Sequence, residues 1–322
     1  MKTTLLAISI AAWAFAHASA QGQAGRQALP VRPAPSPAST EFHVVPVQRS
    51  VYVLASAAGN VAVQIGEDGV VLVDTGSAPM VQKLFAAVRT LSPKPIHTIV
   101  NTHLHADHTG GNEALIKLGA GGPQAPRVMA QENVFNRMMA AAVAANSGIP
   151  AAALPMNAYF TPTRDFFLNG EAIVLHHVPA AHTDGDTLVH FRGSDVLSTG
   201  DVFTPDLYPV IDLENGGSVN GEIAALNRIL ELTVPAKFQE GGTYVIPGHG
   251  RICDEAEVVE YRDMVTIIRD RVADLVKKGL TLQQVRAARP SRDYDAEYGA
   301  DTGFWTTEMF IEAVYRTINE KK

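Results

Sequence analysis

Residues 102–112 read THLHADHTGGN, and this stretch decides both the fold and the chemistry expected of the chain. It places three imidazoles and one carboxylate close together, at His103, His105, Asp107 and His108. An isolated histidine is more often a hydrogen-bonded structural residue. With 11 histidines among 322 residues, however, so dense a pattern rarely arises by chance, and packing does not explain it. The cluster therefore predicts a metal site.

The flanking residues place this cluster on a loop between a strand and a helix. Residues 95–101 (PIHTIVN) form a short apolar run typical of a strand, and the two glycines after the cluster introduce a helix. Side chains two apart on an extended chain point the same way, so His103 and His105 can reach one ion. Where the chain turns, Asp107 and His108 can reach a second position beside it. Imidazole and carboxylate ligands suit a borderline divalent ion such as zinc.

The composition is that of a globular protein with a substantial core. Hydrophobic residues make up 46% of the chain and charged residues 18%, which is neither a disordered nor a membrane-bundle composition. The formal net charge is -7 and the sequence pI is about 5.9. Since no basic surplus is available to neutralise phosphates, nucleic acid is not an expected partner.

The N-terminus predicts export. Residues 1–20 combine Lys2, an apolar run at 5–15 and small residues up to Ala20, the pattern of a signal peptide cleaved after Ala20. A retained membrane anchor is the weaker alternative, because the apolar run falls short of the ~20 residues that span a bilayer. Residues 21–40, rich in Pro, Ala, Ser and Gln, are expected to form a flexible leader. We therefore expect a periplasmic or secreted protein with no membrane contact after cleavage.

Cys253 is the single cysteine of the chain. Export would permit disulfides, but no intrachain disulfide can form with one thiol. We interpret Cys253 as a packed residue rather than a reactive thiol or a metal ligand.

Short strands and helices alternate through the rest of the chain, and each further candidate ligand follows a predicted strand. Residues 42–74 read as a meander of antiparallel strands separated by turn signals. Further along, His182, Asp201 and His249 each come directly after a predicted strand. Residues 254–322 are predicted to be helical and to pack on the main body.

Several other polar residues and one loop have more than one interpretation. Asp74 ends a predicted strand and is either a hydrogen-bond partner that orients an imidazole or a simple turn residue. Adjacent strand residues face opposite ways, so neighbouring histidines of a strand cannot aim at one site. Five histidines are interpreted as structural: His43, His97, His176, His177 and His190. Residues 147–163 are either a lid over a pocket or a surface loop.

Taken in order, the candidate ligands resemble the metallo-β-lactamase superfamily over residues 42–253. The family pattern is HxHxDH, then a single His, then an Asp or its substitute, then a final His. All seven positions are filled here, by His103, His105, Asp107, His108, His182, Asp201 and His249. The resemblance implies an α/β fold, an αββα sandwich with C-terminal helices and metal ions at one edge of the sheets. The catalytic domain would span residues 41–253, with residues 254–322 as a helical extension packed on it.

The resemblance also divides the ligands between two ions. The first ion would be held by His103, His105 and His182. The second ion would be held by Asp107, His108 and His249, and Asp201 would bridge both. Two zinc ions are expected, although iron and manganese occur in the family.

The chemistry that the resemblance implies is hydrolysis. Two cations ~3.5–4 Å apart acidify a water between them, which makes a nucleophile available at neutral pH. Asp107 would orient that nucleophile and could pass its proton to the leaving group. Tyr208 is a candidate for a hydrogen bond to the substrate.

The substrate class is inferred from the residues that this chain carries at positions that vary within the family. True zinc β-lactamases typically carry Cys or Ser in place of Asp201, and often a Lys or Ser where this chain has Thr204 and Phe203. An Asp in the bridging place is instead typical of glyoxalase II-type thioesterases, lactonases and related esterases. We therefore predict an exported dinuclear zinc hydrolase that cleaves a carboxylic ester, lactone or thioester of a small molecule.

Two alternatives differ in the reaction. The first is hydrolysis of β-lactams. The second is a mononuclear iron oxygenase or a non-catalytic binding module, against which the complete second set of ligands argues.

Overall fold

The computed structural model describes residues 41–118, 125–144, 151–239 and 241–319. All of these belong to one compact unit, Arg32–Lys322. The predicted signal peptide, residues 1–20, and the predicted leader, residues 21–40, lie outside the described residues.

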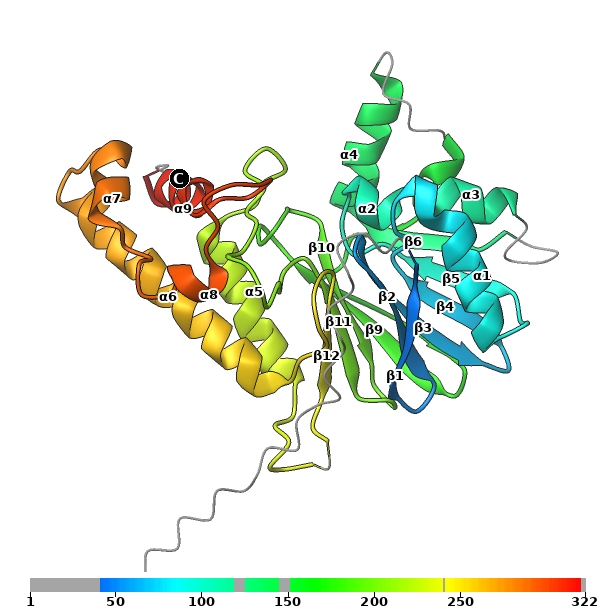
Figure 1. Ribbon diagram of the computed structural model, residues 1–322. Coiled ribbons are helices and arrows are strands. Elements are labelled where there is room, and N and C mark those ends of the chain that lie inside the picture. Colours follow the sequence, from blue (N-terminus) through cyan, green and yellow to red (C-terminus); the bar gives the residue numbers. More distant parts are fainter. Residues whose placement is uncertain (1–40, 119–124, 145–150, 240, 320–322) are drawn as a thin grey trace, which may run out of the picture. The chain divides into compact units, whose positions relative to one another are not determined.

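The first sheet has seven strands in the order β1-β2-β3-β4-β5-β6-β7 (Figure 1). Their bounds are β1 His43–Gln48, β2 Val51–Ser56, β3 Gly59–Gly66, β4 Gly69–Val73, β5 Ile96–Val100, β6 Arg127–Gln131 and β7 Asn157–Tyr159. As predicted, β1 to β4 pair antiparallel as a meander, whereas β4 to β7 pair parallel. Strand β7 lies within residues 147–163, the stretch interpreted from the sequence as a lid or a surface loop, so part of it belongs to the sheet.

The second sheet has five strands in the order β12-β11-β10-β9-β8. Their bounds are β8 Thr163–Leu168, β9 Glu171–Val178, β10 Asp186–Phe191, β11 Val196–Gly200 and β12 Tyr244–Pro247. Strands β9, β10 and β11 are antiparallel neighbours, and β12 runs parallel to β11. Strands β9, β11 and β12 therefore run in the same direction, and the loops that follow them emerge at one edge of the sheet.

The helices connect these strands or follow the last of them (Figure 1). Their bounds are α1 Val81–Leu91, α2 Ala106–Thr109, α3 Asn112–Lys117, α4 Glu132–Val143, α5 Val219–Leu232, α6 Glu255–Lys277, α7 Leu282–Ala288, α8 Asp295–Tyr298 and α9 Thr307–Asn319. Two short 3-10 turns are η1 Ala78–Met80 and η2 Ala151–Ala153. No helix in the described residues is long and apolar enough to cross a membrane.

Alternation of side chains along the strands builds the layers. On β4, Val71 and Val73 pack into the core between the two sheets, whereas Val70 and Leu72 face the helix layer that contains Leu84 of α1. This period of two is expected of a sheet that is covered on both faces. The structure is thus the predicted αββα sandwich, with one helix layer outside each sheet (Figure 1).

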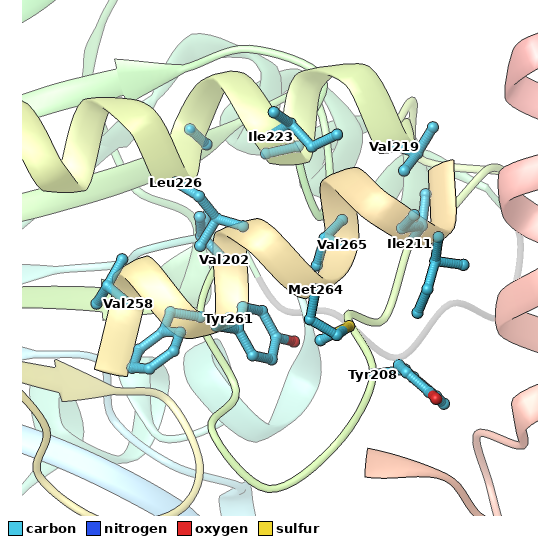
Figure 2. Packing of buried hydrophobic residues seen from close by; sticks show 14 of the residues in the cluster. Val202, Tyr208, Ile211, Val219, Ile223, Leu226, Val258, Tyr261, Met264 and Val265 are labelled. Carbon is cyan, nitrogen blue, oxygen red and sulfur yellow. The ribbon is translucent and has the colours of Figure 1, made fainter. Parts of the chain in front are cut away.

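The C-terminal helices share a core with the second sheet. Figure 2 shows Val219, Ile223 and Leu226 of α5 beside Val258 and Val265 of α6. Helix α6 begins directly after Cys253 with a capping box, in which the side chains of Asp254 and Glu257 bond each other's backbone N–H groups. The domain boundary between residues 253 and 254 stays a prediction.

Candidate metal centre

The seven candidate ligands come together at one edge of the two sheets. His103 and His105 follow β5, and Asp107 and His108 lie in the short helix α2. The other three follow strands of the second sheet, namely His182 after β9, Asp201 after β11 and His249 after β12. Parallel strands end at a common edge, so residues distant in sequence meet there. The structure therefore confirms the prediction that every candidate ligand follows the end of a strand.

Three imidazoles form the first group. The Nδ1 atom of His105 lies 3.1 Å from Nε2 of His103 and 3.0 Å from Nε2 of His182. His103 and His182 are buried, each 1% exposed, whereas His105 is partly exposed. These three nitrogens lie within 4.8 Å of one another, so one ion can contact all three.

Asp107, His108 and His249 form the second group. The Oδ2 atom of Asp107 lies 3.2 Å from Nε2 of His249 and 3.7 Å from Nε2 of His108. Asp201 contacts two members of the second group: its Oδ1 is 3.3 Å from Nε2 of His108 and its Oδ2 is 3.7 Å from Nε2 of His249. It also lies within 4.8 Å of His103, a member of the first group, with which it and His108 form a further set of possible ligands. This placement is the one that a bridging carboxylate requires.

Four of the imidazoles have an acceptor on the nitrogen that faces away from the cluster. Nε2 of His105 contacts Asp212 Oδ2 at 2.8 Å, and Nδ1 of His108 contacts Asp74 Oδ2 at 2.8 Å. Nδ1 of His182 contacts the backbone oxygen of Val210 at 2.5 Å. An acceptor there holds the proton on the outer nitrogen, which leaves the inner nitrogen with a lone pair for a metal ion.

Asp74 also fixes the tautomer of the fourth imidazole. It accepts hydrogen bonds from Thr102 N and Thr102 Oγ1, both at 2.8 Å. Because the threonine hydroxyl donates to Asp74, its oxygen accepts from Nδ1 of His103, 3.1 Å away. Asp74 has a positive φ of 67° and is 2% exposed. Of its two interpretations, the structure confirms the hydrogen-bond partner that orients an imidazole.

Two buried atoms test whether a cation fits this cluster. Nε2 of His108 and Oδ1 of Asp201 have no hydrogen-bond partner among the described residues. Burial opposes a charge on His108, but Asp201 and Asp74 raise its pKa well above the ordinary value, so this corner attracts positive charge. Burial and the neighbouring His108 hold the pKa of His103 well below its usual range, which keeps it in the neutral form that ligates metals. The residues therefore fit divalent cations.

Glycine at position 248 allows the close approach of His108 and Asp201. A Cβ atom on Gly248 would stand 2.1 Å from Oδ1 of Asp201 and 2.9 Å from Cε1 of His108. Any side chain there would displace two candidate ligands. The loop that carries His249 therefore requires glycine at position 248, because its backbone lies against two of the candidate ligands.

Sequence reasoning missed Asp212, the carboxylate behind His105. Two hydrogen bonds from Asn215, to Oδ1 at 3.1 Å and to Oδ2 at 2.6 Å, hold it in place. Burial opposes its charge, but the hydrogen bonds from His105 and Asn215 lower the pKa of Asp212, so it is ionised. No motif or spacing marks it, because it lies in an irregular segment whose path depends on packing.

We expect Asp212→Asn to weaken metal binding at the three-histidine group. The amide oxygen can still accept the hydrogen bond from His105, but it carries no negative charge. Losing such a charged partner behind a metal ligand typically costs about 10–100-fold in metal affinity. Competition with a chromophoric chelator measures the zinc affinity of each site. Asp165→Asn, at an exposed position of β8, is the matched control and should bind zinc as the unaltered protein does. Equal affinities in both variants would contradict the role given to Asp212.

The structure does not bring Tyr208 to the cluster, which corrects the role predicted for it. Tyr208 is 1% exposed, and its ring stacks on Phe310 with centroids 4.6 Å apart. Its hydroxyl is directed to the C-terminal segment, 3.0 Å from Asp295 Oδ1 and 3.2 Å from the Ser291 oxygen. Figure 2 shows it among the buried residues packed on α6. The position of this aromatic residue close after Asp201 suggested a substrate contact. In the structure, however, its side chain points into the hydrophobic core and away from the metal cluster.

Accordingly, Tyr208→Phe should leave turnover unchanged within about twofold and lower the free energy of unfolding by about 1 kcal/mol, the usual net worth of a buried hydrogen bond. Urea unfolding and steady-state kinetics measure the two effects. A large loss of turnover in a variant of near-normal stability would support the prediction that Tyr208 contacts the substrate.

Other predicted residues take structural positions. Cys253 is fully buried, as predicted, and burial raises the pKa of its thiol. His176 and His177 face opposite sides of β9: His177 Nε2 contacts the Asp184 backbone oxygen at 2.9 Å, whereas His176 faces α5 and contacts Arg228. Neither belongs to the metal cluster.

Known proteins share this sequence pattern and fold. The sequence profile of the metallo-beta-lactamase superfamily matches residues 54–249. A linear primary-alkylsulfatase of Pseudomonas sp. (strain ATCC 19151) is 24% identical over 251 residues, which cover 66% of this chain and 46% of that protein.

Solved structures show the same fold. The sec-alkylsulfatase Pisa1 from Pseudomonas sp. superposes with a TM-score of 0.61 at 19% identity, over 85% of this chain and 50% of the other. A metallo-beta-lactamase from Pontibacter korlensis superposes with a TM-score of 0.55 at 18% identity, over 70% of this chain and 99% of the other. The chain thus spans about half the length of the alkylsulfatases it matches.

The profile match covers more than half of the chain and includes all seven candidate ligands. The two facing sheets and their helix layers are those of the predicted fold. This chain belongs to the metallo-beta-lactamase superfamily.

Proposed function

We propose that this chain is a metal-dependent hydrolase that cleaves an ester bond of a small molecule at a two-metal centre. The observation that carries the proposal is the pair of ligand groups with Asp201 between them. In this proposal the three-histidine group holds one ion, and Asp107, His108 and His249 hold the other. Two divalent ions bound there would acidify water and polarise the bond to be cleaved. Nitrogen and oxygen ligands favour zinc, with iron or manganese as alternatives.

Asp107 is the carboxylate of the cluster best placed to exchange a proton with a bound molecule. Its side chain is 43% exposed, whereas that of Asp201 is 11% exposed. Burial raises the pKa of Asp107, but the hydrogen bond with His249 and the charge of His108 have the larger combined effect. The pKa therefore lies below its ordinary value, and the group is ionised. An ionised, accessible carboxylate can accept a hydrogen bond from water, orient it, and hold its proton.

Alkyl sulfate esters are the substrate class that we propose first, because the matched relatives are named as alkylsulfatases. Carboxylic esters, lactones and thioesters are the second candidate class, because an Asp occupies the bridging place. A β-lactam substrate is less well supported. Phe203 is fully buried, and Thr204 is 3% exposed with its hydroxyl 3.0 Å from that of Tyr261. This segment thus offers no side chain to grip a drug's carboxylate.

A panel of substrates run on protein of known metal content tests the proposal. It would contain octyl sulfate, an aryl ester, a lactone, a thioester and a cephalosporin, with release of inorganic sulfate followed for the first. We expect octyl sulfate to be hydrolysed. This activity should be lost when a chelator removes the metal ions and should return when zinc is added. Hydrolysis of carboxylic substrates alone would favour the second class. Metal-replete protein that hydrolyses no member of the panel would refute the proposal.

We also propose that the protein is exported. The proposal rests on the signal-like residues 1–20. Sequencing the N-terminus of protein purified from its native host tests it, since a mature chain that starts at residue 21 is expected.

A further inference from the structure

A pocket lies at the end of the second sheet that is opposite to the metal cluster. Its volume is about 650 Å³, within the range usual for small-molecule sites. Gly193 and Asp195, in the turn before β11, line it, whereas Asp201 follows the other end of that strand. The five residues of β11 separate the two ends by roughly 16 Å. The pocket is therefore not part of the metal centre.

Two buried histidines line this pocket and each has a nitrogen without a partner. His176 of β9 and His190 of β10 are both 7% exposed, and their rings lie 6.3 Å apart. Nε2 of His176 and Nδ1 of His190 have no hydrogen-bond partner among the described residues. A buried polar atom left unsatisfied is costly, so a group that supplies the missing hydrogen bonds would be stabilised there.

The neighbouring Arg228 determines what kind of group fits. Its Nη2 lies 3.3 Å from Nδ1 of His176, and a guanidinium can only donate. Nδ1 of His176 therefore accepts, and in the neutral ring the proton is on Nε2, the nitrogen without a partner. That nitrogen is a donor, so the complementary atom of a ligand is an acceptor.

The acidic residues of the pocket have bonding partners, whereas two of its basic residues do not. Both acids are engaged: Asp195 accepts hydrogen bonds from Thr243 and Gln239, and Glu231 pairs with Arg228 at 2.8 Å. Arg49 and Arg192 line the same pocket, and neither guanidinium group has a hydrogen-bond or ion-pair partner in the described part of the chain. With Arg228 paired to Glu231, the two unpaired arginines outnumber the one remaining acid, Asp195, and the buried His176 lies beside them.

We propose that this pocket binds a small molecule through an oxyanion group, such as a sulfate or a carboxylate. The oxyanion accepts from Nε2 of His176 and pairs with the Arg192 and Arg49 guanidinium groups. Arginine is suited to this role because its planar fork bonds two oxygens at once. Burial and the nearby charges of Arg228, His190 and Arg192 lower the pKa of His176 to about 4, which agrees with a pocket that favours negative charge. The site is separate from the proposed hydrolytic centre and does not depend on it.

Calorimetric titration of the full-length, metal-loaded protein tests the site. Sodium sulfate and sodium acetate are the two probes, and sodium chloride at the same ionic strength is the blank. We expect saturable binding of at least one oxyanion, and a loss of about tenfold or more in affinity in Arg192→Met. Arg192 is exposed, so this substitution should not impair folding.

A matched control separates this pocket from general charge effects and from the metal centre. Arg164→Met removes the same charge from an exposed position of β8 in the same sheet, outside the pocket, and should bind the probe as the unaltered protein does. His249→Ala alters the metal centre and should also leave this binding unchanged. No saturable binding, equal losses in Arg192→Met and Arg164→Met, or a loss confined to His249→Ala would each overturn the proposal.

Discussion

Replacing Asp201 by Ala is expected to abolish most of the activity, lowering turnover by roughly 10³-fold. The carboxylate of Asp201 lies 3.3 Å from His108 and 3.7 Å from His249 of the second group, and within 4.8 Å of His103 of the first. Without it no negative charge remains between the groups, so both ions should be held less tightly. We expect elemental analysis of the purified variant to find fewer than two ions per chain, and steady-state kinetics to show the loss in turnover.

The control for this variant is Asp206→Ala. Asp206 is an exposed carboxylate further along the same segment and belongs to neither ligand group. It should retain two ions and normal turnover. If Asp201→Ala also retained two ions and normal turnover, while its circular dichroism showed a folded protein, Asp201 would not be a ligand and the two-metal proposal would fail.

Asp107→Asn should lower turnover on the best substrate by about 10²-fold while leaving metal binding largely intact. The amide keeps the shape and one oxygen of the carboxylate, so it can still contact an ion. It cannot take up a proton, which is the function proposed for Asp107. Metal content and turnover should be measured on the same preparation, because the prediction is that they separate.

Glu113→Gln provides the comparison for Asp107→Asn. Glu113 is an acid of α3, close to the cluster in sequence, and it pairs with Lys117 on the surface. It should behave as the unaltered protein does. Normal turnover in Asp107→Asn would remove Asp107 from the reaction. A matching loss of metal and turnover would show that Asp107 acts as a ligand alone.

Much of the centre was predictable because its ligands follow local rules. The spacing of His103 and His105 places both side chains on one side of an extended chain, and His182, Asp201 and His249 each end a strand. That these residues meet at one site was implied by the family resemblance, and the structure gives the reason, since strands that run the same way end at the same edge. The sandwich itself was implied by the family resemblance.

Tyr208 shows where this reasoning stops. Its position close after Asp201 suggested a substrate contact, yet its side chain packs on Phe310 of α9. Strand β8 was also missed, although its residues pair with β9 over six positions. Sequence proximity to a ligand does not determine the direction of a side chain in an irregular segment, because distant helices compete for it.

The sequence by itself determined the ligand types, their order and the strand ends that carry them, because periodicity and turn residues act over a few neighbouring positions. Only the tertiary structure decided that Asp212 supports His105, that Asp74 orients both His108 and Thr102, and that His176 faces a pocket lined by Arg192. Each of these contacts joins segments that are remote in the chain. Their partners are set by how helices and sheets pack, and no local pattern in the sequence records that packing.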